Sequence, residues 1–146
     1  MSSRQNSGGP HPAKPVDLTR LPRPDAGLLF LRLTGSGLLL YVHGVPKLVH
    51  FSAELQHIDD PLHLGRGVTL VLALFAEIAC PLLIAAGWLT RLATLPILFL
   101  LLVSMALVHP DWDVATGQFA WLLVIVFGTI ALAGPGEYSI DGHHRR

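Results

Sequence analysis

The chain has 146 residues, of which 51% are hydrophobic and 14% are charged. This is the length of one ordinary domain, but the composition is too apolar for a soluble one. Ten Lys and Arg residues balance ten Asp and Glu residues, so no basic surface of the kind that binds nucleic acid is expected. Embedding in a lipid bilayer is the simplest interpretation of this composition.

The first 25 residues are rich in proline and lack the continuous apolar core that a cleavable signal peptide requires. Such a composition cannot bury enough apolar surface to fold by itself. We therefore expect residues 1–25 to form a disordered cytoplasmic tail.

Four apolar stretches follow, each close to the length that a helix needs to cross a hydrocarbon layer of ~30 Å. They predict an all-α fold, a four-helix transmembrane bundle over residues 26–136, with spans at about 26–45, 68–89, 92–108 and 115–134. The break at Thr90-Arg91 is so short that the second and third spans must run antiparallel. Gly134-Pro135-Gly136 ends the fourth span, and residues 137–146 are expected to form a second cytoplasmic tail.

The basic residues predict the orientation of the bundle. If the N-terminus lies inside, most Lys and Arg residues outside the spans are cytoplasmic, and only Lys47 and Arg66 face the other side. Both termini are therefore predicted to be cytoplasmic.

The loop between the first two spans, about 46–66, is too polar to cross the membrane. Its apolar residues nevertheless recur at roughly helical spacing, as Leu48, Phe51, Leu55, Ile58 and Leu62. We expect this loop to lie on the membrane surface, with any helix in it ending at Pro61.

Ionisable side chains inside a bilayer are costly unless they pair with one another or face a cavity. Arg32 lies in the inner half of the first predicted span, and Glu77 lies near the middle of the second. If the two helices are antiparallel, the two residues differ in depth by about 7 to 8 Å, which an Arg side chain can cover. The sequence therefore predicts an Arg32–Glu77 ion pair.

Other polar residues extend this candidate intramembrane site. His43 shares a helix face with Arg32, and Lys47 follows His43 by four residues. His109 ends the third predicted span near the same membrane level as His43. The candidate site thus consists of Arg32, His43, Lys47, Glu77 and His109.

Pro81 cannot donate the backbone hydrogen bond that would close on the carbonyl of Glu77, so it is expected to kink the second span. Such a kink occurs both at cavities and in purely structural spans.

The histidines and carboxylates lack the HxxxH or ExxH spacing of a specific metal site, so no metal is assigned. No phosphate-binding loop, nucleophile elbow or Rossmann fingerprint is present, and the catalytic residues of any enzyme remain unknown.

Several short motifs occur in a characteristic order: Leu31-Arg32-Leu33, His43-Gly44-Val45-Pro46-Lys47, Phe75-Ala76-Glu77, Gly87-Trp88-Leu89-Thr90-Arg91, a histidine ending the third span, and the segment from Gly134 to Asp141. Over about residues 28–141 the sequence resembles the DoxX family. Glu137 stands where members of this family often have Arg. The resemblance implies a multi-pass protein of the bacterial inner (plasma) membrane. It also implies possible partners, because some relatives are membrane subunits of a thiosulfate:quinone oxidoreductase and others are linked to oxidative-stress complexes.

Two main functions remain open at this point, and a third, permeation of a small solute or proton, requires the chain to oligomerise because four short spans enclose only a narrow path. In the first, the protein is a membrane subunit of a redox complex, and Arg32, His43, Glu77 and His109 line a pocket for a quinone, whose protons a histidine and a carboxylate could relay. In the second, it is a non-enzymatic anchoring or assembly subunit, and the buried ion pair only fixes helix register. A fully packed bundle without a cavity near Glu77 would exclude the first. Cys80 is single, so sulfur chemistry through a thiolate relay is not supported.

Overall fold

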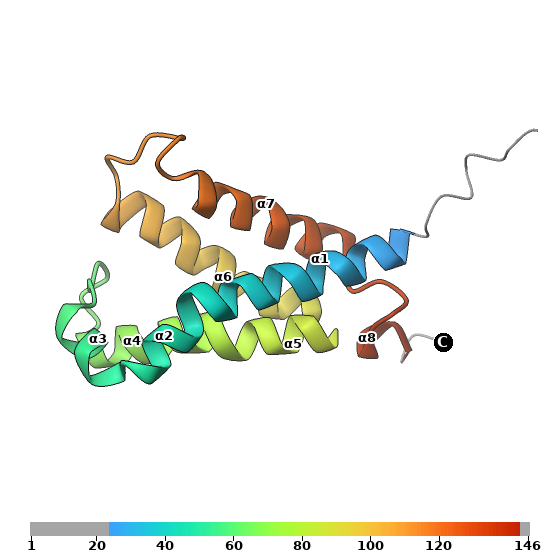
Figure 1. Cartoon of the computed structure of the whole chain (residues 1–146), viewed down its shortest axis with the longest axis horizontal. Coiled ribbons are helices and arrows are strands. Elements are labelled where there is room, and N and C mark those ends of the chain that lie inside the picture. Colours follow the sequence, from blue (N-terminus) through green and yellow to red (C-terminus); the bar gives the residue numbers. More distant parts are fainter. Residues whose placement is uncertain (1–23, 144–146) are drawn as a thin grey trace, which may run out of the picture.

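The computed structural model describes residues 24–143, and every regular element in that range is a helix (Figure 1). The predicted all-α class is therefore confirmed. Of the predicted N-terminal tail, residues 1–25, only Pro24 and Asp25 fall within the described range, where they begin the first helix.

Three helices are long and apolar enough to cross a membrane: Pro24–Val49, Arg66–Ala86 and Thr90–Val108. Each contains one π-helical segment. In chain order they consist of α1 (Pro24–Leu39), η2 (Leu40–Gly44) and α2 (Val45–Val49), then α4 (Arg66–Leu74), η3 (Phe75–Ala79) and α5 (Cys80–Ala86), then α6 (Thr90–Val103) and η4 (Ser104–Val108). The first of them extends past the predicted end of its span at residue 45.

The fourth helix, α7 (Gln118–Ala133), is apolar and has 16 residues. At 1.5 Å per residue its length is about 24 Å, a little less than the hydrocarbon thickness. Helical hydrogen bonds continue before it, because the N–H of Trp121 donates to Gly117 and that of Gly117 donates to Asp113. Since α7 packs along α6 and α1, the four helices form one bundle.

The core of the bundle is aliphatic and draws on all four long helices. Its buried residues are Leu39, Cys80, Ile84, Ala93, Ile97, Leu123, Phe127 and Ile130. Outward-facing residues are equally apolar, as expected for a chain surrounded by lipid, so close packing rather than a difference in polarity distinguishes the core from the surface.

The segment between the first two long helices folds over one end of the bundle. It contains α3 (Phe51–His57) and an irregular stretch, residues 58–65, and α3 packs beside α4. The helix ends at His57, before Pro61, because the backbone of Ile58 is extended. We call residues 51–65 the roof.

The opposite end of the bundle is closed by the C-terminal segment. The carboxylate of Asp141 accepts hydrogen bonds from the backbone N–H groups of Leu89 and Thr90, at 3.0 and 2.9 Å, and from the Thr90 hydroxyl. The N–H of Asp141 donates to the carbonyl of Gly87. Within residues 137–143, which include α8 (Ile140–His143), the predicted tail is therefore docked on the α5–α6 turn. We call this the latch end.

Both ends of the described chain meet at the latch end. The N–H of Glu137 donates to the carboxylate of Asp25, in the first turn of α1, at 2.8 Å. This places the start of α1 and the C-terminal segment on the same side of the bundle (Figure 1). That this side faces the cytoplasm stays a prediction.

Gly87 is the position at the latch end where a side chain is least tolerable. It has a φ of +76°, and a Cβ there would overlap the Arg32 guanidinium and Ser139. We expect Gly87→Ala to lower the melting temperature of the purified protein, with the left-handed backbone alone costing about 1–3 kcal/mol. Gly128→Ala in α7 is the control, because nothing lies within 4 Å of its Cβ position. Equal melting temperatures for the two variants would contradict the packing described here.

Candidate functional site

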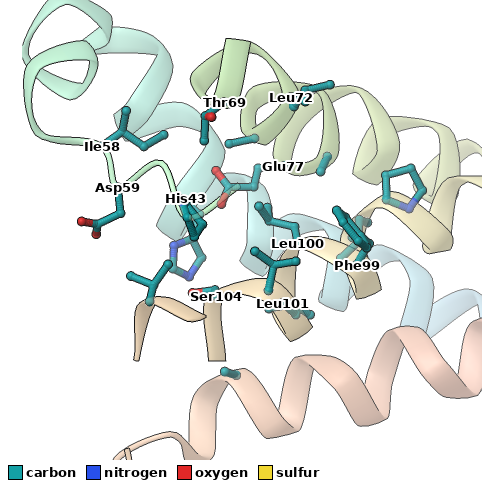
Figure 2. A pocket seen from close by; sticks show the side chains of 18 of the residues that line it. His43, Ile58, Asp59, Thr69, Leu72, Glu77, Phe99, Leu100, Leu101 and Ser104 are labelled. Atoms are coloured by element: carbon teal, nitrogen blue, oxygen red, sulfur yellow. The ribbon is translucent and has the colours of Figure 1, made fainter. Parts of the chain in front are cut away.

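The end of the bundle opposite the latch contains a cavity of about 950 Å³ (Figure 2). All four long helices and the roof contribute to its walls. Most of the lining is apolar, but His43, Lys47, Glu77 and His109 are among its residues. Figure 2 shows the carboxylate of Glu77 and the ring of His43 directed into the same space. The structure thus gathers four of the five predicted site residues around one cavity.

The strongest polar contact in the cavity wall joins the first two long helices. The ammonium group of Lys47 donates to both carboxylate oxygens of Glu77, at 2.6 and 2.7 Å. Glu77 is 5% exposed, and Lys47 is half-buried. With so little water nearby, each charge depends on the other for compensation.

Lys47 reaches Glu77 because of the geometry around Gly44. The first helix continues to Val49, and helical side chains lean toward the N-terminus of their helix, so Lys47 leans back into the bundle. Gly44 is buried against the backbone of Glu77, and a Cβ there would overlap the Glu77 carbonyl. The glycine therefore lets η2 and η3 approach closely enough for the Lys47–Glu77 pair to form.

The predicted Arg32–Glu77 pair is wrong. Arg32 is fully buried, but its guanidinium donates to the backbone carbonyls of Ile84 and Tyr138. Ile84 lies seven residues beyond Glu77, about 10 Å further along the helix. Carbonyls at the latch end thus accept from both terminal nitrogens of the Arg32 guanidinium, and Lys47 occupies both oxygens of Glu77. Arg32 belongs to the latch end and not to the cavity.

The ring of His43 enters the cavity wall with an aromatic contact to the protein. It lies 5.7 Å from the ring of Phe119, in a tilted arrangement. No hydrogen bond joins the ring nitrogens to any residue in the range 24–143. One ring nitrogen of a neutral histidine donates and the other accepts, so His43 has both functions available for a ligand.

The three π-helical segments found within residues 24–143 all border the cavity, and each is followed by a proline. The N–H groups of Val45, Cys80 and His109 each close the wide turn on a carbonyl five residues back. The next residues are Pro46, Pro81 and Pro110. A proline has no N–H and its ring clashes with the preceding turn, so widening that turn relieves the contact. The local change expected at Pro81 therefore takes the form of η3, which carries Glu77.

His109 and the third π segment complete the cavity wall. The ring of His109 stacks on that of Trp112, with centroids 3.9 Å apart and an angle of 3° between the planes. Ser104, the first residue of η4, lines the cavity on the side facing His43 (Figure 2). In the part of the chain that the structure describes, no group of three His, Cys, Asp or Glu residues is placed to hold a metal ion.

Hydrogen bonds fix the roof to the start of α4. One carboxylate oxygen of Asp60 accepts from the hydroxyl of Thr69 at 2.6 Å and from the N–H of Leu64 at 3.0 Å. The other accepts from the N–H of Gly65 at 2.7 Å. The guanidinium of Arg66 donates to the carbonyl of Gln56, at 2.6 Å, and so attaches the end of α3 as well. The roof is therefore held in place by polar contacts over an apolar cavity.

Sequence reasoning missed two kinds of functional residue. Gly44 was noticed as part of a motif, but nothing in the sequence indicates which helix approaches it. Asp60 lies in a loop for which the sequence predicted only a position on the membrane surface, whereas its carboxylate organises the roof. The one available signal was the recurrence of proline soon after His43, Glu77 and Ser104, because a proline near the end of an apolar helix indicates an irregular turn there.

These features define a multi-helix membrane protein with a cavity beside a buried ion pair. The model of the DoxX family matches residues 27–110, more than half of the chain, and the chain belongs to the DoxX family. It is 27% identical over 127 residues to "Inner membrane protein YphA" of Escherichia coli strain K12, an alignment that covers 78% of this chain and 88% of that protein. No solved structure matches the chain. The protein is thus a multi-pass inner-membrane protein, as the resemblance implied.

The motifs that carried the resemblance separate into two groups in space. One group lies at the latch end, where Arg32, the turn beginning at Gly87 and the segment ending at Asp141 contact one another. The other group lies at the cavity, where the motif from His43 to Lys47 meets Glu77. Most polar groups of the first group bond to other parts of the protein, whereas in the second group the Lys47–Glu77 pair and the ring of His43 line the cavity.

The Lys47–Glu77 pair should behave as a unit in a double-mutant cycle. Lys47→Met or Glu77→Leu alone leaves one buried charge without its partner, which we expect to cost about 3–5 kcal/mol of stability. The variant carrying both changes should lose clearly less than the sum of the two. Thermal or denaturant unfolding in lipid nanodiscs measures this, and additive losses would mean that the two side chains do not interact.

The roof gives a pH-dependent prediction. The hydrogen bond from the Thr69 hydroxyl, with those from the backbone N–H groups of Gly65 and Leu64, lowers the pKa of Asp60 from its ordinary value of 3.8. Because the pKa is lower in the folded state, the carboxylate stabilises the protein above pH 3.8, and this contribution is lost as pH falls through the folded-state pKa.

We therefore expect Asp60→Asn to lower the melting temperature at neutral pH, and the difference from the wild type to shrink as the pH drops below 3.8. Asp59→Asn, at the adjacent exposed carboxylate, is the matched control and should have little effect at any pH. A constant difference between Asp60→Asn and the wild type across this range would contradict the role given to the roof.

Proposed function

We propose that this DoxX-family protein is a membrane subunit of a redox complex and binds a quinone in the cavity beside Lys47 and Glu77. The observation that carries the proposal is the cavity itself. A volume of about 950 Å³ lies within the range of small-molecule sites, and a mostly apolar lining with a few convergent polar groups is their usual composition. The cavity near Glu77 that a redox role requires is present.

The polar groups suit the oxygen atoms of a quinone. Two of the three N–H donors of Lys47 bond to Glu77, which leaves one for a ligand. His43, whose ring has no hydrogen bond to the described chain, can supply a second donor. Apolar side chains such as Leu100 and Leu101, on the facing helix, suit the ring of the ligand (Figure 2).

A quinone, when bound, would supply two-electron, two-proton chemistry to this site. The chain's own residues have separate tasks in that scheme. Lys47 orients a ligand oxygen and compensates negative charge on it. His43 can hold or release a proton at a ring nitrogen, and Glu77 can exchange one through Lys47. The low exposure of Glu77 excludes most water from that exchange.

The anchoring alternative uses the same ion pair only to fix helix register. It needs neither a cavity nor a histidine whose ring nitrogens have no hydrogen bond within residues 24–143. If no small molecule binds in the cavity, the anchoring role is therefore the one to expect.

Trp112 lines the cavity and provides an intrinsic reporter for quinone binding. In a Trp88→Phe/Trp121→Phe background, a quinone that binds in the cavity should quench the fluorescence of Trp112 in a saturable way. We expect His43→Gln to weaken binding about fivefold, the usual effect of one lost hydrogen bond. The Lys47→Met/Glu77→Leu variant, in which the pair is removed as a unit, should weaken it about tenfold or more.

His50→Gln is the matched control, because His50 is exposed and lies outside the cavity lining. The natively purified protein should also contain quinone by mass spectrometry, together with copurifying redox subunits. Unsaturable quenching that His43→Gln and His50→Gln affect equally would contradict quinone binding and favour the anchoring role.

A further inference from the structure

The cavity extends to the outer surface of the bundle between the second and third long helices. Several apolar residues both line the cavity and are exposed on the outside of the protein. Those on the second and third long helices include Leu72 on α4, Phe75 on η3, and Leu95 and Phe99 on α6. In Figure 2, Leu72 and Phe99 lie on the two helices that flank the cavity. We call these four residues the lateral mouth.

The mouth follows from the way in which the two helices are connected. α5 and α6 are joined by the short turn at Gly87, and α6 packs against α5 and then against η3. Beyond η3 the second long helix continues as α4, whose main contacts are with η3 and α3 rather than with α6. The two helices therefore separate toward the cavity end, and apolar side chains line the gap.

The roof lies over the other end of the cavity. The roof contributes residues to the lining and is fixed to α4 through Asp60 and through Arg66. The four mouth residues are all Leu or Phe, so no hydrogen bond between their side chains holds the mouth closed. Because the mouth lies along apolar membrane-spanning helices, hydrocarbon chains rather than water surround it.

We propose that the ligand enters from the bilayer through the lateral mouth, and that while bound its hydrocarbon chain lies between Phe75 and Phe99 with its oxygen-bearing head against Lys47 and His43. This inference rests on the proposed function and specifies its ligand class, a chain-bearing amphiphile from the lipid phase rather than a quinone head group dissolved in water. The polar groups at one side of the cavity and the apolar residues at its mouth match the two parts of such a molecule.

A quinone analogue with a photoreactive diazirine at the end of a decyl chain tests the placement of the chain. It is equilibrated with the intact protein in nanodiscs and irradiated, and the labelled residues are mapped by peptide mass spectrometry. We expect label on the mouth residues Leu72, Phe75, Leu95 and Phe99, in competition with the unmodified decyl quinone. Label on roof residues such as Ile58 or Leu62 would overturn the inference.

Two matched substitutions on the second long helix sharpen the test. Leu72 and Leu82 are both exposed leucines, but only Leu72 lines the cavity. We expect Leu72→Phe, which narrows the mouth, to reduce saturable labelling about fivefold, whereas Leu82→Phe leaves it unchanged. Equal labelling of the two variants would overturn the lateral route.

The quenching of Trp112 separates a failure of this inference from a failure of the proposed function. If the decyl quinone quenches Trp112 saturably but its chain labels the roof, quinone binding stands and the lateral placement is overturned. If the quinone neither quenches Trp112 nor labels any residue of the cavity, the proposed function fails together with the inference.

Discussion

The contact between Lys47 and Glu77 determines how the first two long helices fit together. An unpaired buried charge costs several kcal/mol, so once Glu77 lies in the second helix, the first must supply a cation at the same level. Lys47 meets that requirement only because Gly44 allows the two backbones to approach. The register that results places His43 beside the pair and turns it toward the space between the helices (Figure 2). The position of the cavity is therefore a consequence of satisfying one charge.

The apolar stretches of the sequence predicted the class of the fold and the approximate place of each long helix, because membrane spans must match the thickness of the bilayer. The site was predicted less well. His43, Lys47, Glu77 and His109 could be selected because ionisable groups are rare in apolar helices. Their partners could not, since pairing depends on how far one helix is shifted along another. The sequence contains no direct measure of that shift, and it gave no reason to prefer Lys47 over Arg32 as the partner of Glu77.

Arg32 illustrates how a buried charge can be structural. Its guanidinium binds carbonyls of α5 and of the C-terminal segment, and Asp141 in that segment also receives the first N–H groups of α6. These contacts bring three parts of the chain together at the latch end, where Gly87 provides the necessary space. Because most of its polar groups are directed at other parts of the protein, this end has little capacity for a ligand. The motifs thus divide between a latch end whose polar groups mostly bond to the protein and a cavity end that can accept a ligand.

The distribution of irregular backbone favours a ligand-binding role over simple anchoring. Regular α-helices would fix the same bundle with better hydrogen bonding, and π turns are rare in proteins and occur frequently at functional sites. Here η2, η3 and η4 lie on three different helices, yet all three border the same cavity. An anchoring subunit requires only that its helices keep their register, and the Lys47–Glu77 pair already provides that. The prolines that follow account for each widened turn locally, and the placement of all three turns around one cavity supports the proposal that they direct His43, Glu77 and Ser104 at a bound molecule.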